Sequence, residues 1–293
     1  MTTQAVTAGP AQAPAPRSVP AQGRSRLRRA ISLGIARGRL EVLMFFRGTE
    51  TVVFSVAFPA FALVILSAMF SGPLPLDDKV TYSEYLVPGV IGIGLMVTGF
   101  QTLAISIAIE RDRGALKRLA ATPMPRSSYF IGKVFMVVVT SVVETALLIA
   151  VSVVFYGAHL PRNAGAWLTL TWVSLLGMAA SALCGIALSS LPRNSRSAPT
   201  VVAPFAFVLQ FISGAAIVFT SLPGWLQFVG ELFPLKWMCQ GLRSVFLPDS
   251  YAQHEAGGGW QLGWVAVVLG VWVVIGLVLC ALTFRWTKSR GDG

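Results

Sequence analysis

Six long apolar stretches, separated by short polar segments, dominate the chain from residue 51 onward. Each holds roughly the 20 apolar residues that an α-helix needs to cross the hydrocarbon core of a bilayer. Helices of soluble proteins show polar positions every few residues because one face meets water, and these stretches lack that pattern. We predict an all-α integral membrane protein whose residues 50–293 form a six-span transmembrane domain. Its helices are expected at about residues 51–70, 86–109, 134–156, 166–191, 200–222 and 260–284.

Residues 1–23 differ in character from everything that follows. They are rich in alanine and proline and hold a single charge, at Arg17. Such a composition cannot bury enough apolar surface to form a packed core. A basic start followed by an apolar run, which marks a cleaved signal peptide, is also missing here. We therefore expect a disordered cytoplasmic tail.

A basic, weakly amphipathic segment follows at residues 24–49. At 100° per residue, apolar side chains such as Ile31 and Ile35 fall on one side, with arginines opposite them. This pattern predicts an amphipathic helix lying in the membrane interface, with its arginines facing anionic lipid headgroups. Gly34 and Gly38 lower the helix propensity of this segment.

Composition and charge support the membrane interpretation and orient the chain. Hydrophobic residues make up 55% of the sequence, charged residues 12%, and the mean hydropathy is +0.70. Of the 23 Lys and Arg residues, 19 lie in the termini and the loops on one side of the predicted helices. Cytoplasmic loops retain Lys and Arg, so both termini are expected in the cytoplasm and the protein in the cytoplasmic membrane. The net charge of +11 then needs no nucleic-acid partner.

Enzyme chemistry finds little support in the sequence. The two histidines, His159 and His254, lie in different external loops, and no HExxH, CxxC or GxSxG motif is present. A P-loop for ATP is also missing, because Gly132-Lys133 is followed by Val134 where the motif requires Ser or Thr. We predict no catalytic, cofactor-binding or metal-binding residues, so another chain or an ion gradient must supply energy.

The loop between the second and third predicted helices, residues 110–133, is the most informative segment. Its sequence is ERDRGALKRLAATPMPRSSYFIGK, a helix-compatible basic run closed by Thr122-Pro123. Proline disfavours helix at the residue before it, so the run predicts a short cytoplasmic helix with a defined end. This helix is either a solvated loop element that only sets topology or a rigid handle that a partner protein grips.

Two sets of residues resemble ABC-2 type permeases, especially daunorubicin-exporter membrane subunits. Residues 110–119, Thr122-Pro123 and Gly132-Lys133 resemble the coupling segment of that family, with Ala115 where Thr is usual. Residues 222–227, 233–235 and 241–243 are similar to the family's external hairpin before the last span. The apolar stretch 221–249, cut by prolines, itself predicts a re-entrant helical hairpin. The hairpin residues singled out are Pro223, Trp225, Pro234 and Arg243.

The resemblance implies a half-transporter. Two copies of this chain, or one copy and a homologous permease, enclose a pathway in the lipid bilayer, and two separate ATPase subunits bind ATP and Mg²⁺ and dock on the cytoplasmic loops. This chain itself is then not an enzyme. The residues implied in ATPase coupling are Glu110, Arg111, Arg113, Gly114, Leu116, Lys117, Arg118, Leu119, Thr122 and Pro123.

Polar side chains inside the predicted spans are the remaining candidates. Glu144 lies about 15 Å into the third span, near the middle of the bilayer, where an ionisable group is costly. It either bonds Ser141, Thr140 or a residue of another span, or carries protons. Two glutamines lie at similar depth and suit hydrogen bonds between helices. The family implies that the second and fifth spans line the pathway, so the pathway candidates are Thr98, Gln101, Glu144, Phe207, Gln210 and Phe211.

Three functions remain open at this point. The main prediction is a permease subunit of an ATP-driven multidrug-type exporter that moves an amphipathic or hydrophobic compound, such as a drug, antibiotic, lipid or glycolipid, by alternating access. Sparse intramembrane charge disfavours a small hydrophilic ion as cargo. The alternative is a proton-coupled secondary transporter with Glu144 as the relay. A membrane-embedded enzyme or scaffold is the third.

Overall fold

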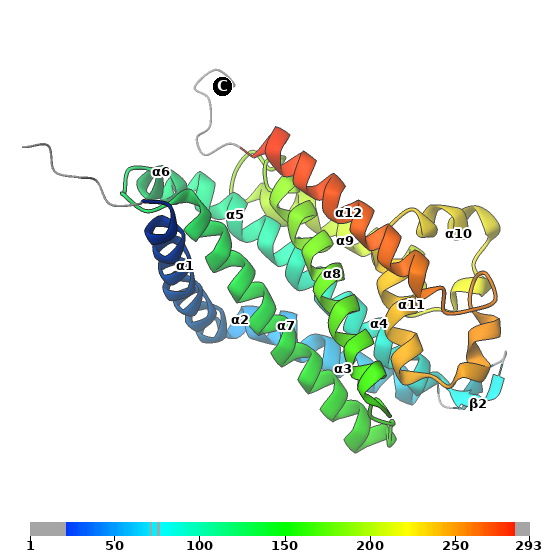
Figure 1. The fold of residues 1–293 in the computed structure, drawn as a ribbon. Coiled ribbons are helices and arrows are strands. Elements are labelled where there is room, and N and C mark those ends of the chain that lie inside the picture. The colour runs from blue at the N-terminus through cyan, green and yellow to red at the C-terminus, as the bar shows by residue number, and fades with distance from the viewer. Residues whose placement is uncertain (1–21, 71, 75–76, 285–293) are drawn as a thin grey trace, which may run out of the picture.

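The computed structural model describes residues 22–70, 72–74 and 77–284. Most of the tail expected at residues 1–23 lies outside the described residues, and its last two residues belong to the first helix. Figure 1 shows a bundle of helices, with a short antiparallel strand pair between the third and fourth helices. In chain order, the elements are α1 (Gln22–Arg47), α2 (Thr49–Val52), the π-helical segment η1 (Val53–Ala57), α3 (Phe58–Met69), β1 (Pro73–Leu74), β2 (Asp77–Thr81), α4 (Tyr82–Met96), the π-helical segment η2 (Val97–Thr102), α5 (Leu103–Asp112), α6 (Ala115–Ala120), α7 (Arg126–Tyr156), α8 (Ala164–Leu188), α9 (Ser197–Ile212), the 3₁₀ turn η3 (Phe219–Ser221), α10 (Gly224–Glu231), α11 (Pro234–Phe246), the 3₁₀ segment η4 (Asp249–His254) and α12 (Leu262–Thr283).

Four helices in the described part of the chain are long and apolar enough to cross a membrane. One is the continuous helix Tyr82–Asp112, made of α4, η2 and α5, and the others are α7, α8 and α12. The first and fifth predicted stretches hold shorter apolar helices, Val53–Met69 and Ser197–Ile212. The chain is therefore a multi-pass, all-α membrane protein, and each of the six predicted stretches contains a helix.

The second predicted helix begins four residues earlier than its apolar stretch because a capping box starts it at Tyr82. The hydroxyl of Thr81 accepts a hydrogen bond from the backbone N–H of Glu84, at 3.3 Å. The carboxylate of Glu84 accepts one in return from the backbone N–H of Thr81, at 2.9 Å. This exchange satisfies two backbone donors at the end of the helix. Hydropathy marks only the apolar part of this helix.

The prediction for the fifth stretch, residues 200–222, is wrong at its C-terminal end. Helix α9 ends at Ile212, and a turn follows in which Gly214 has φ +70°. Glycine adopts this left-handed conformation without steric cost. The carbonyl of Gly214 also accepts hydrogen bonds from Arg243 and from the Tyr85 hydroxyl. Apolar residues continue past the turn, which is why hydropathy did not reveal the end of the helix.

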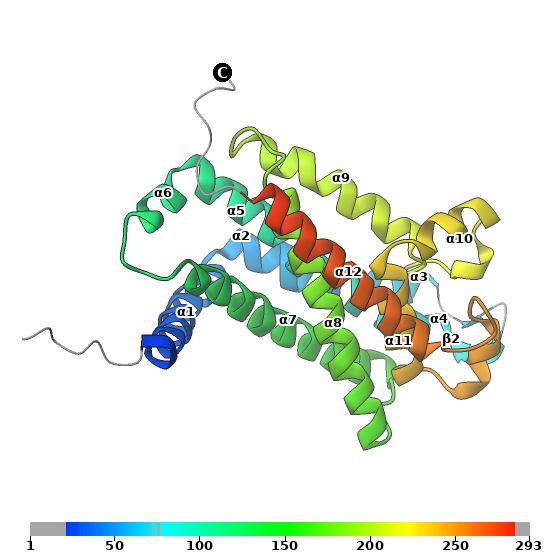
Figure 2. The same cartoon turned by 45° about the horizontal axis from the view of Figure 1, so that its top comes forward.

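Helix α11 is almost completely buried and packs between α4 and α8. A Cβ at Gly92 of α4 would lie 2.9 Å from Sγ of Cys239, and one at Gly177 of α8 would lie 2.7 Å from the Met238 side chain. Small residues therefore let the three helices approach closely, as is typical of helix packing in membranes. In the view of Figure 2, α12 runs between α9 on one side and α7 on the other.

Helix α1 packs lengthwise on the start of α7 (Figure 1). A Cβ at Gly34 would lie 2.5 Å from Cγ2 of Ile131, and one at Gly38 would lie 2.7 Å from Cδ1 of Phe135. The two glycines, which lowered the predicted helix propensity, are thus the contact points. The hydroxyl of Ser128 adds a 3.0 Å hydrogen bond to the carbonyl of Ala30.

The first half of the apolar side of α1 predicted from periodicity does not form this contact, whereas Phe45, near the end of that side, is buried in the core. Leu27, Ile31 and Ile35 are 63%, 42% and 41% exposed. Over this first half of α1, the face on α7 consists of small residues, because close backbone approach requires them. The exposed apolar side remains free to enter a lipid interface, which stays a prediction.

Replacing Gly34 by leucine is expected to separate α1 from α7 and to lower the free energy of unfolding by roughly 1–3 kcal/mol, the cost of overpacking a close contact. Gly270→Leu on α12 is the matched control, because a Cβ there meets nothing within 4 Å. Thermal or denaturant unfolding in detergent measures both variants. Equal stability of the two variants would show that the α1–α7 contact is not tight.

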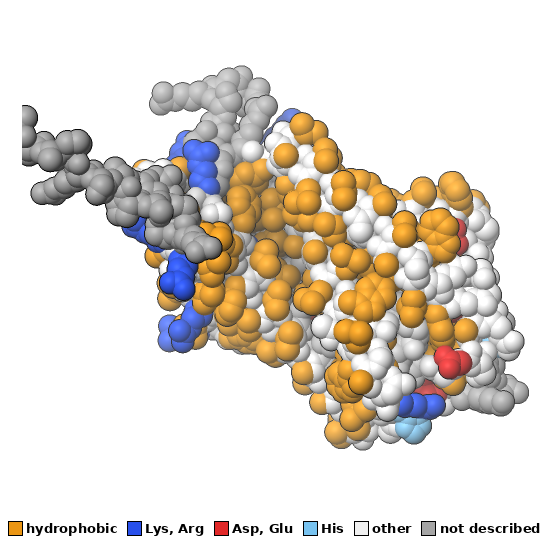
Figure 3. Space-filling view, viewed as in Figure 1, with side chains coloured by type: hydrophobic (Ala, Val, Ile, Leu, Met, Phe, Trp, Pro, Cys, Tyr) orange, Lys and Arg blue, Asp and Glu red, His pale blue; other side chains and the backbone are white. Residues whose placement is uncertain are grey.

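Apolar side chains cover most of the side of the bundle in Figure 3, while Lys and Arg gather at the end that carries α1 and α6. The exposed apolar residues come from several helices, including Phe54 of η1, Val154 of α7 and Leu282 of α12, which are 70%, 76% and 74% exposed. A surface this apolar is expected where lipid, not water, surrounds the protein.

Candidate functional site

The loop between α5 and α7 holds the short helix that its sequence predicts. After α5, Arg113 and Gly114 turn the chain, and Gly114 has φ +71°. Helix α6 then runs from Ala115 to Ala120. Leu116 is fully buried and fixes this helix to the core. After α6, the Thr122 hydroxyl donates a 2.7 Å hydrogen bond to the carbonyl of Leu119.

Proline closes this loop as expected. Pro123 lies in the turn after α6, and Pro125 is the residue that precedes the first turn of α7. Proline fits this place because the start of a helix needs no N–H from it. The short helix is thus fixed by the burial of its own Leu116, and a turn with two prolines follows it.

The charged residues of the loop divide into two groups by their surroundings. Arg111 turns inward, where it donates to the carbonyl of Ser189 at 2.6 Å and lies 5.5 Å from the ring of Phe284. Arg113, Lys117 and Arg118 are exposed and have no ion-pair partner among the described residues. These three cations are available for contacts outside the chain.

Glu110 belongs to a network of charges that joins three helices. Its carboxylate lies 2.5 Å from Nζ of Lys133 on α7 and 3.6 Å from Nη2 of Arg37 on α1, and it accepts a 2.9 Å hydrogen bond from the Tyr129 hydroxyl. Lys133 also pairs with Glu41 of α1 at 3.0 Å, and Arg37 pairs with Glu41 at 2.9 Å. Lys133 and Glu41 are almost completely buried.

The sequence analysis did not identify Arg37 and Glu41 as members of an ion-pair network. It assigned Glu110 to ATPase coupling and not to this network. The signal available was a carboxylate, Glu41, on an otherwise basic segment. Buried charges require partners, and here two cations meet two carboxylates. The network therefore ties α1 to both ends of the loop that carries α6.

A cavity of about 560 Å³ lies beside this network, between α1, α5 and α7. Glu41, Glu110 and Lys133 line it, together with Gln101 of η2 and Arg113. Gln101, a predicted pathway residue, thus lies toward the end of the bundle that carries the charge network.

Glu144 and Thr98 meet in the middle of the bundle. The Thr98 hydroxyl donates a 3.0 Å hydrogen bond to Oε2 of Glu144, whose other oxygen has no partner among the described residues. Glu144 packs directly on Gly94 of α4, where a Cβ would collide with it. The partner is therefore a residue of the second helix, one of the alternatives that the sequence left open.

Thr98 lies in the π-helical segment η2. A Cβ at Gly185 of α8 would lie 2.6 Å from the carbonyl oxygen of Phe100, so α8 approaches the widened turn closely. Single π-turns within α-helices often mark functional sites. Nothing in the hydropathy of residues 97–102 indicated this irregularity.

Within the part of the chain that the structure describes, α9 is covered on one side only. Phe207 and Phe211 are 61% and 51% exposed, and their ring centroids are 4.8 Å apart. Gln210 is partly buried beside them. On another side of α9, Phe205 and Val208 help to line an apolar groove of about 720 Å³. None of the six predicted pathway residues lines this groove.

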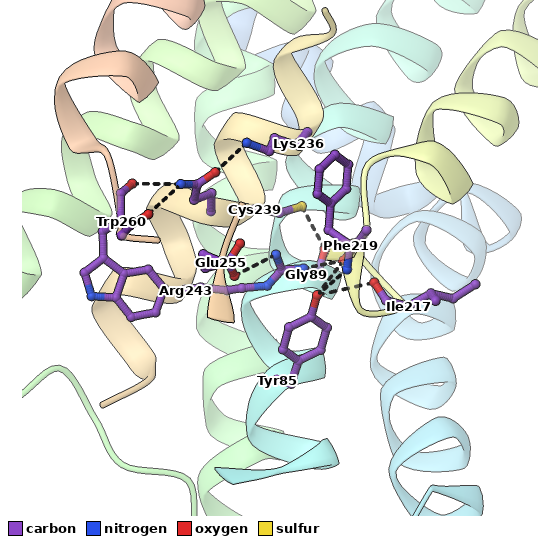
Figure 4. A network of polar contacts seen from close by, with 12 residues as sticks. Tyr85, Gly89, Ile217, Phe219, Lys236, Cys239, Arg243, Glu255 and Trp260 are labelled. Atoms are coloured by element: carbon purple, nitrogen blue, oxygen red, sulfur yellow. Dashed lines mark hydrogen bonds and ion pairs between the residues drawn. The ribbon is translucent and has the colours of Figure 1, made fainter. Parts of the chain in front are cut away.

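The segment predicted to be external, residues 221–249, contains two short helices, α10 and α11, with Pro223 and Pro234 at their starts. Trp225 is 68% exposed. Arg243 is completely buried, donates to Glu255 at 3.1 Å and to the carbonyl of Gly214, and lies over the Tyr85 ring at 4.1 Å (Figure 4). These contacts join the end of α9 to α4 and α11.

Lys236 is a second buried cation on α11 (Figure 4). Its ammonium group donates to Gln240 at 2.7 Å and lies 3.7 Å from the Trp237 ring centroid. Gln240 in turn donates to the carbonyls of Gly259 and Trp260, at 3.1 Å each. Spacing of three and four residues places Lys236, Gln240 and Arg243 on one face of α11, a pattern that the sequence analysis did not use.

Comparison with known proteins identifies a family and several relatives. A family model described as "ABC-2 type transporter" matches residues 37–247. "Probable doxorubicin resistance ABC transporter permease protein DrrC" of Mycobacterium tuberculosis (strain ATCC 25618 / H37Rv) is 26% identical over 248 residues, 82% of this chain and 83% of that protein.

A second relative is longer. "Probable multidrug ABC transporter permease YbhS" of Escherichia coli (strain K12) is 23% identical over 208 residues, which are 71% of this chain and 51% of that protein. The match thus spans about half the length of YbhS. The family model matches well over half of the length of this chain. The chain therefore belongs to the ABC-2 type transporter family.

Proposed function

We propose that this chain is the membrane subunit of an ATP-driven ABC exporter that moves an amphipathic or hydrophobic compound, such as a drug, antibiotic, lipid or glycolipid, across the cytoplasmic membrane. Membership of the ABC-2 family supports the proposal. The names of its relatives, which refer to multidrug transport and to doxorubicin resistance, support a drug-like cargo.

The observation that carries the proposal is helix α6 with its exposed cations. Arg113, Lys117 and Arg118 are open to solvent, while Leu116 anchors the helix in the core. Such a helix transmits a force from an acidic partner to α5 and α7. We assign the docking of two ATPase subunits, which bind ATP and Mg²⁺, to these three cations.

Glu110 and Arg111 have a different role in this proposal. Their side chains contact α1, α7 and the end of α8, so they hold the loop in place and do not contact the ATPase. Gly114, Leu119, Thr122 and Pro123 shape the loop and its ends. In this proposal, the coupling segment thus has two parts. The buried side chains hold the loop against the rest of the chain, and the exposed side chains bind the ATPase.

The pathway in this proposal forms between two copies of the chain. Phe207 and Phe211 leave one face of α9 uncovered, and an exposed apolar face of this kind suits a second subunit. All six apolar stretches cross the bilayer, with α1, α6 and both termini on the cytoplasmic side and α10–α11 as a re-entrant hairpin on the outside. ATP-driven closure of the partners alternates the access of the pathway.

Transport of doxorubicin into inverted membrane vesicles, prepared with this chain and a candidate ATPase, tests the proposal. Uptake is expected to need ATP and to stop when the P-loop lysine of the ATPase is replaced. Collapse of the proton gradient should leave it unchanged. Uptake that survives ATP depletion but stops with the gradient would instead support the alternative, a proton-coupled transporter with Glu144 as the relay.

A further inference from the structure

The cavity between α1, α5 and α7 offers both apolar walls and accessible polar groups. Its volume, about 560 Å³, falls within the range of about 300–1,000 Å³ that is usual for small-molecule sites. The cavity follows one face of α5, from Gln101 just before this helix to Arg113 just after it. Ile105 and Ile109 lie between them at a spacing of four residues and share that face. At 1.5 Å per residue, this face is about 18 Å long.

The remaining walls are apolar and leave an opening at the surface. Phe45 of α1 and Met136 of α7 are buried and form two of these walls. Met44 of α1 also lines the cavity and is 64% exposed, and Arg113 is exposed as well. A ligand therefore reaches the cavity without any rearrangement of the described chain.

The charges around the cavity leave one cation without a partner. Lys133 pairs with Glu41 and Glu110 and also donates to a serine hydroxyl, so its three donors are used. Arg37 pairs with the same two carboxylates. Arg113 lines the cavity but has no ion-pair partner among the described residues. Three cations and two carboxylates sum to one positive charge, and the unpaired one is the guanidinium of Arg113.

Two uncharged polar side chains lie at the opposite end of the cavity, away from α6. The amide of Gln101 and the hydroxyl of Thr102 are partly exposed and have no hydrogen-bond partner among the described residues. Neither group belongs to the buried polar atoms that lack a partner. Both are thus accessible from the cavity, where a ligand can replace water as their partner.

We propose that this cavity binds an amphipathic acid, with a carboxylate at one end and a hydroxyl, carbonyl or amide group within its apolar body. Arg113 binds the carboxylate, Gln101 and Thr102 bind the uncharged polar group, and the apolar walls hold the chain between them. A guanidinium has five N–H donors, so Arg113 also keeps donors for an ATPase. Binding of the acid needs neither the ATPase nor a second copy of the chain.

Equilibrium binding to the full chain in phosphatidylcholine nanodiscs, without any ATPase, tests the site. The probe is radiolabelled 12-hydroxyoctadecanoate, and empty nanodiscs measure its partition into the lipid. Saturable binding above this background is expected. Octadecanoate, which lacks the hydroxyl, should bind about threefold to tenfold more weakly, the loss of one hydrogen bond. The methyl ester of the probe, which lacks the charge, should bind at least about tenfold more weakly.

Equal binding of the three compounds, or no saturable binding of the probe, would overturn the proposal. Because no ATPase is present, either result leaves the proposed exporter function standing. Loss of ATP-dependent transport, in turn, would not remove binding of the acid.

A pair of arginine variants tests recognition of the carboxylate. Arg113→Met is expected to weaken binding of the hydroxy acid at least about tenfold and to leave binding of its methyl ester unchanged. Arg118→Met is the matched control, because it removes an exposed cation of the same loop that does not line the cavity. If both variants bind the acid as the unchanged chain does, Arg113 does not recognise it.

The double variant Q101L/T102V tests recognition of the hydroxyl. It should bind 12-hydroxyoctadecanoate no more tightly than octadecanoate. Its affinity for octadecanoate should equal that of the unchanged chain, which also shows that the variant folds. A preference for the hydroxy acid that survives in this variant would refute recognition by these two side chains.

A third pair of variants tests the place of the ligand without removing any polar group. Ile109 lines the cavity, whereas Val134, next to Lys133 on α7, is 48% exposed outside it. Ile109→Trp is expected to abolish saturable binding, because the larger ring fills the cavity, and Val134→Trp to leave it intact. Equal binding by the two variants would place the ligand elsewhere.

Discussion

Reversal of the three exposed charges in the loop between α5 and α7, in the variant R113E/K117E/R118E, is expected to abolish the proposed docking of the ATPase. The Kd should rise at least about a hundredfold, because placing like charges together at an interface costs several kcal/mol. ATP-dependent transport should be lost with it. The fold should remain intact, because these side chains are exposed and have no ion-pair partner among the described residues. Binding of purified ATPase to the chain in nanodiscs measures the effect.

The matched control keeps every charge and changes only the side chains, as R113K/K117R/R118K. Since the proposed attraction depends on charge and not on a bidentate geometry, this variant should bind the ATPase within a fewfold of the unchanged chain. If the charge-reversed variant still binds and supports transport, the exposed cations of α6 are not the docking surface.

The long apolar stretches could be located from the sequence because twenty apolar residues in succession have few other uses. Each of them contains a helix in the structure. The ends were harder, and for particular reasons. Helix α4 starts at a capping box among polar residues, and α9 ends at a glycine turn inside an apolar run. Hydropathy reports the surroundings of a residue, not its backbone conformation.

The charged residues could not be sorted from the sequence. Arg111 and Arg113 are alike in type and close in position, yet one is held by Ser189 and the other is exposed. The difference depends on which distant segment packs nearby. Glu110 likewise finds its partners on α1 and α7, at residues 37 and 133, and a pattern within one loop contains no information about those contacts.

The glycines of α1 are a second case in which contacts with a distant segment decide the role of a residue. Gly34 and Gly38 weaken an isolated helix, so from the sequence they counted only as residues that lower helix propensity. In the structure they permit contact with Ile131 and Phe135. The gain from close packing outweighs the loss of propensity, as tertiary contacts often do. A four-residue spacing of glycines facing a predicted span was the available signal.

Removal of the Lys133 ammonium group is expected to destabilise the chain strongly. In Lys133→Met, the carboxylates of Glu41 and Glu110 lose their buried partner and Arg37 alone balances two negative charges. Breaking a buried ion pair on one side costs about 3–5 kcal/mol. Unfolding in detergent should show a loss of this size. Lys117→Met, which removes an exposed lysine of α6, should be nearly neutral.

The second substitution Glu41→Gln should restore much of this loss. In K133M/E41Q, Arg37 and Glu110 remain as one cation and one carboxylate, so the charges balance again. Removing both partners of a buried pair is far less costly than removing one. If the double variant is no more stable than Lys133→Met, the loss comes from packing of the lysine chain and not from unpaired charge. Because the network fastens α1 and α7 to the loop that carries α6, the recovered stability should bring back ATP-dependent transport as well.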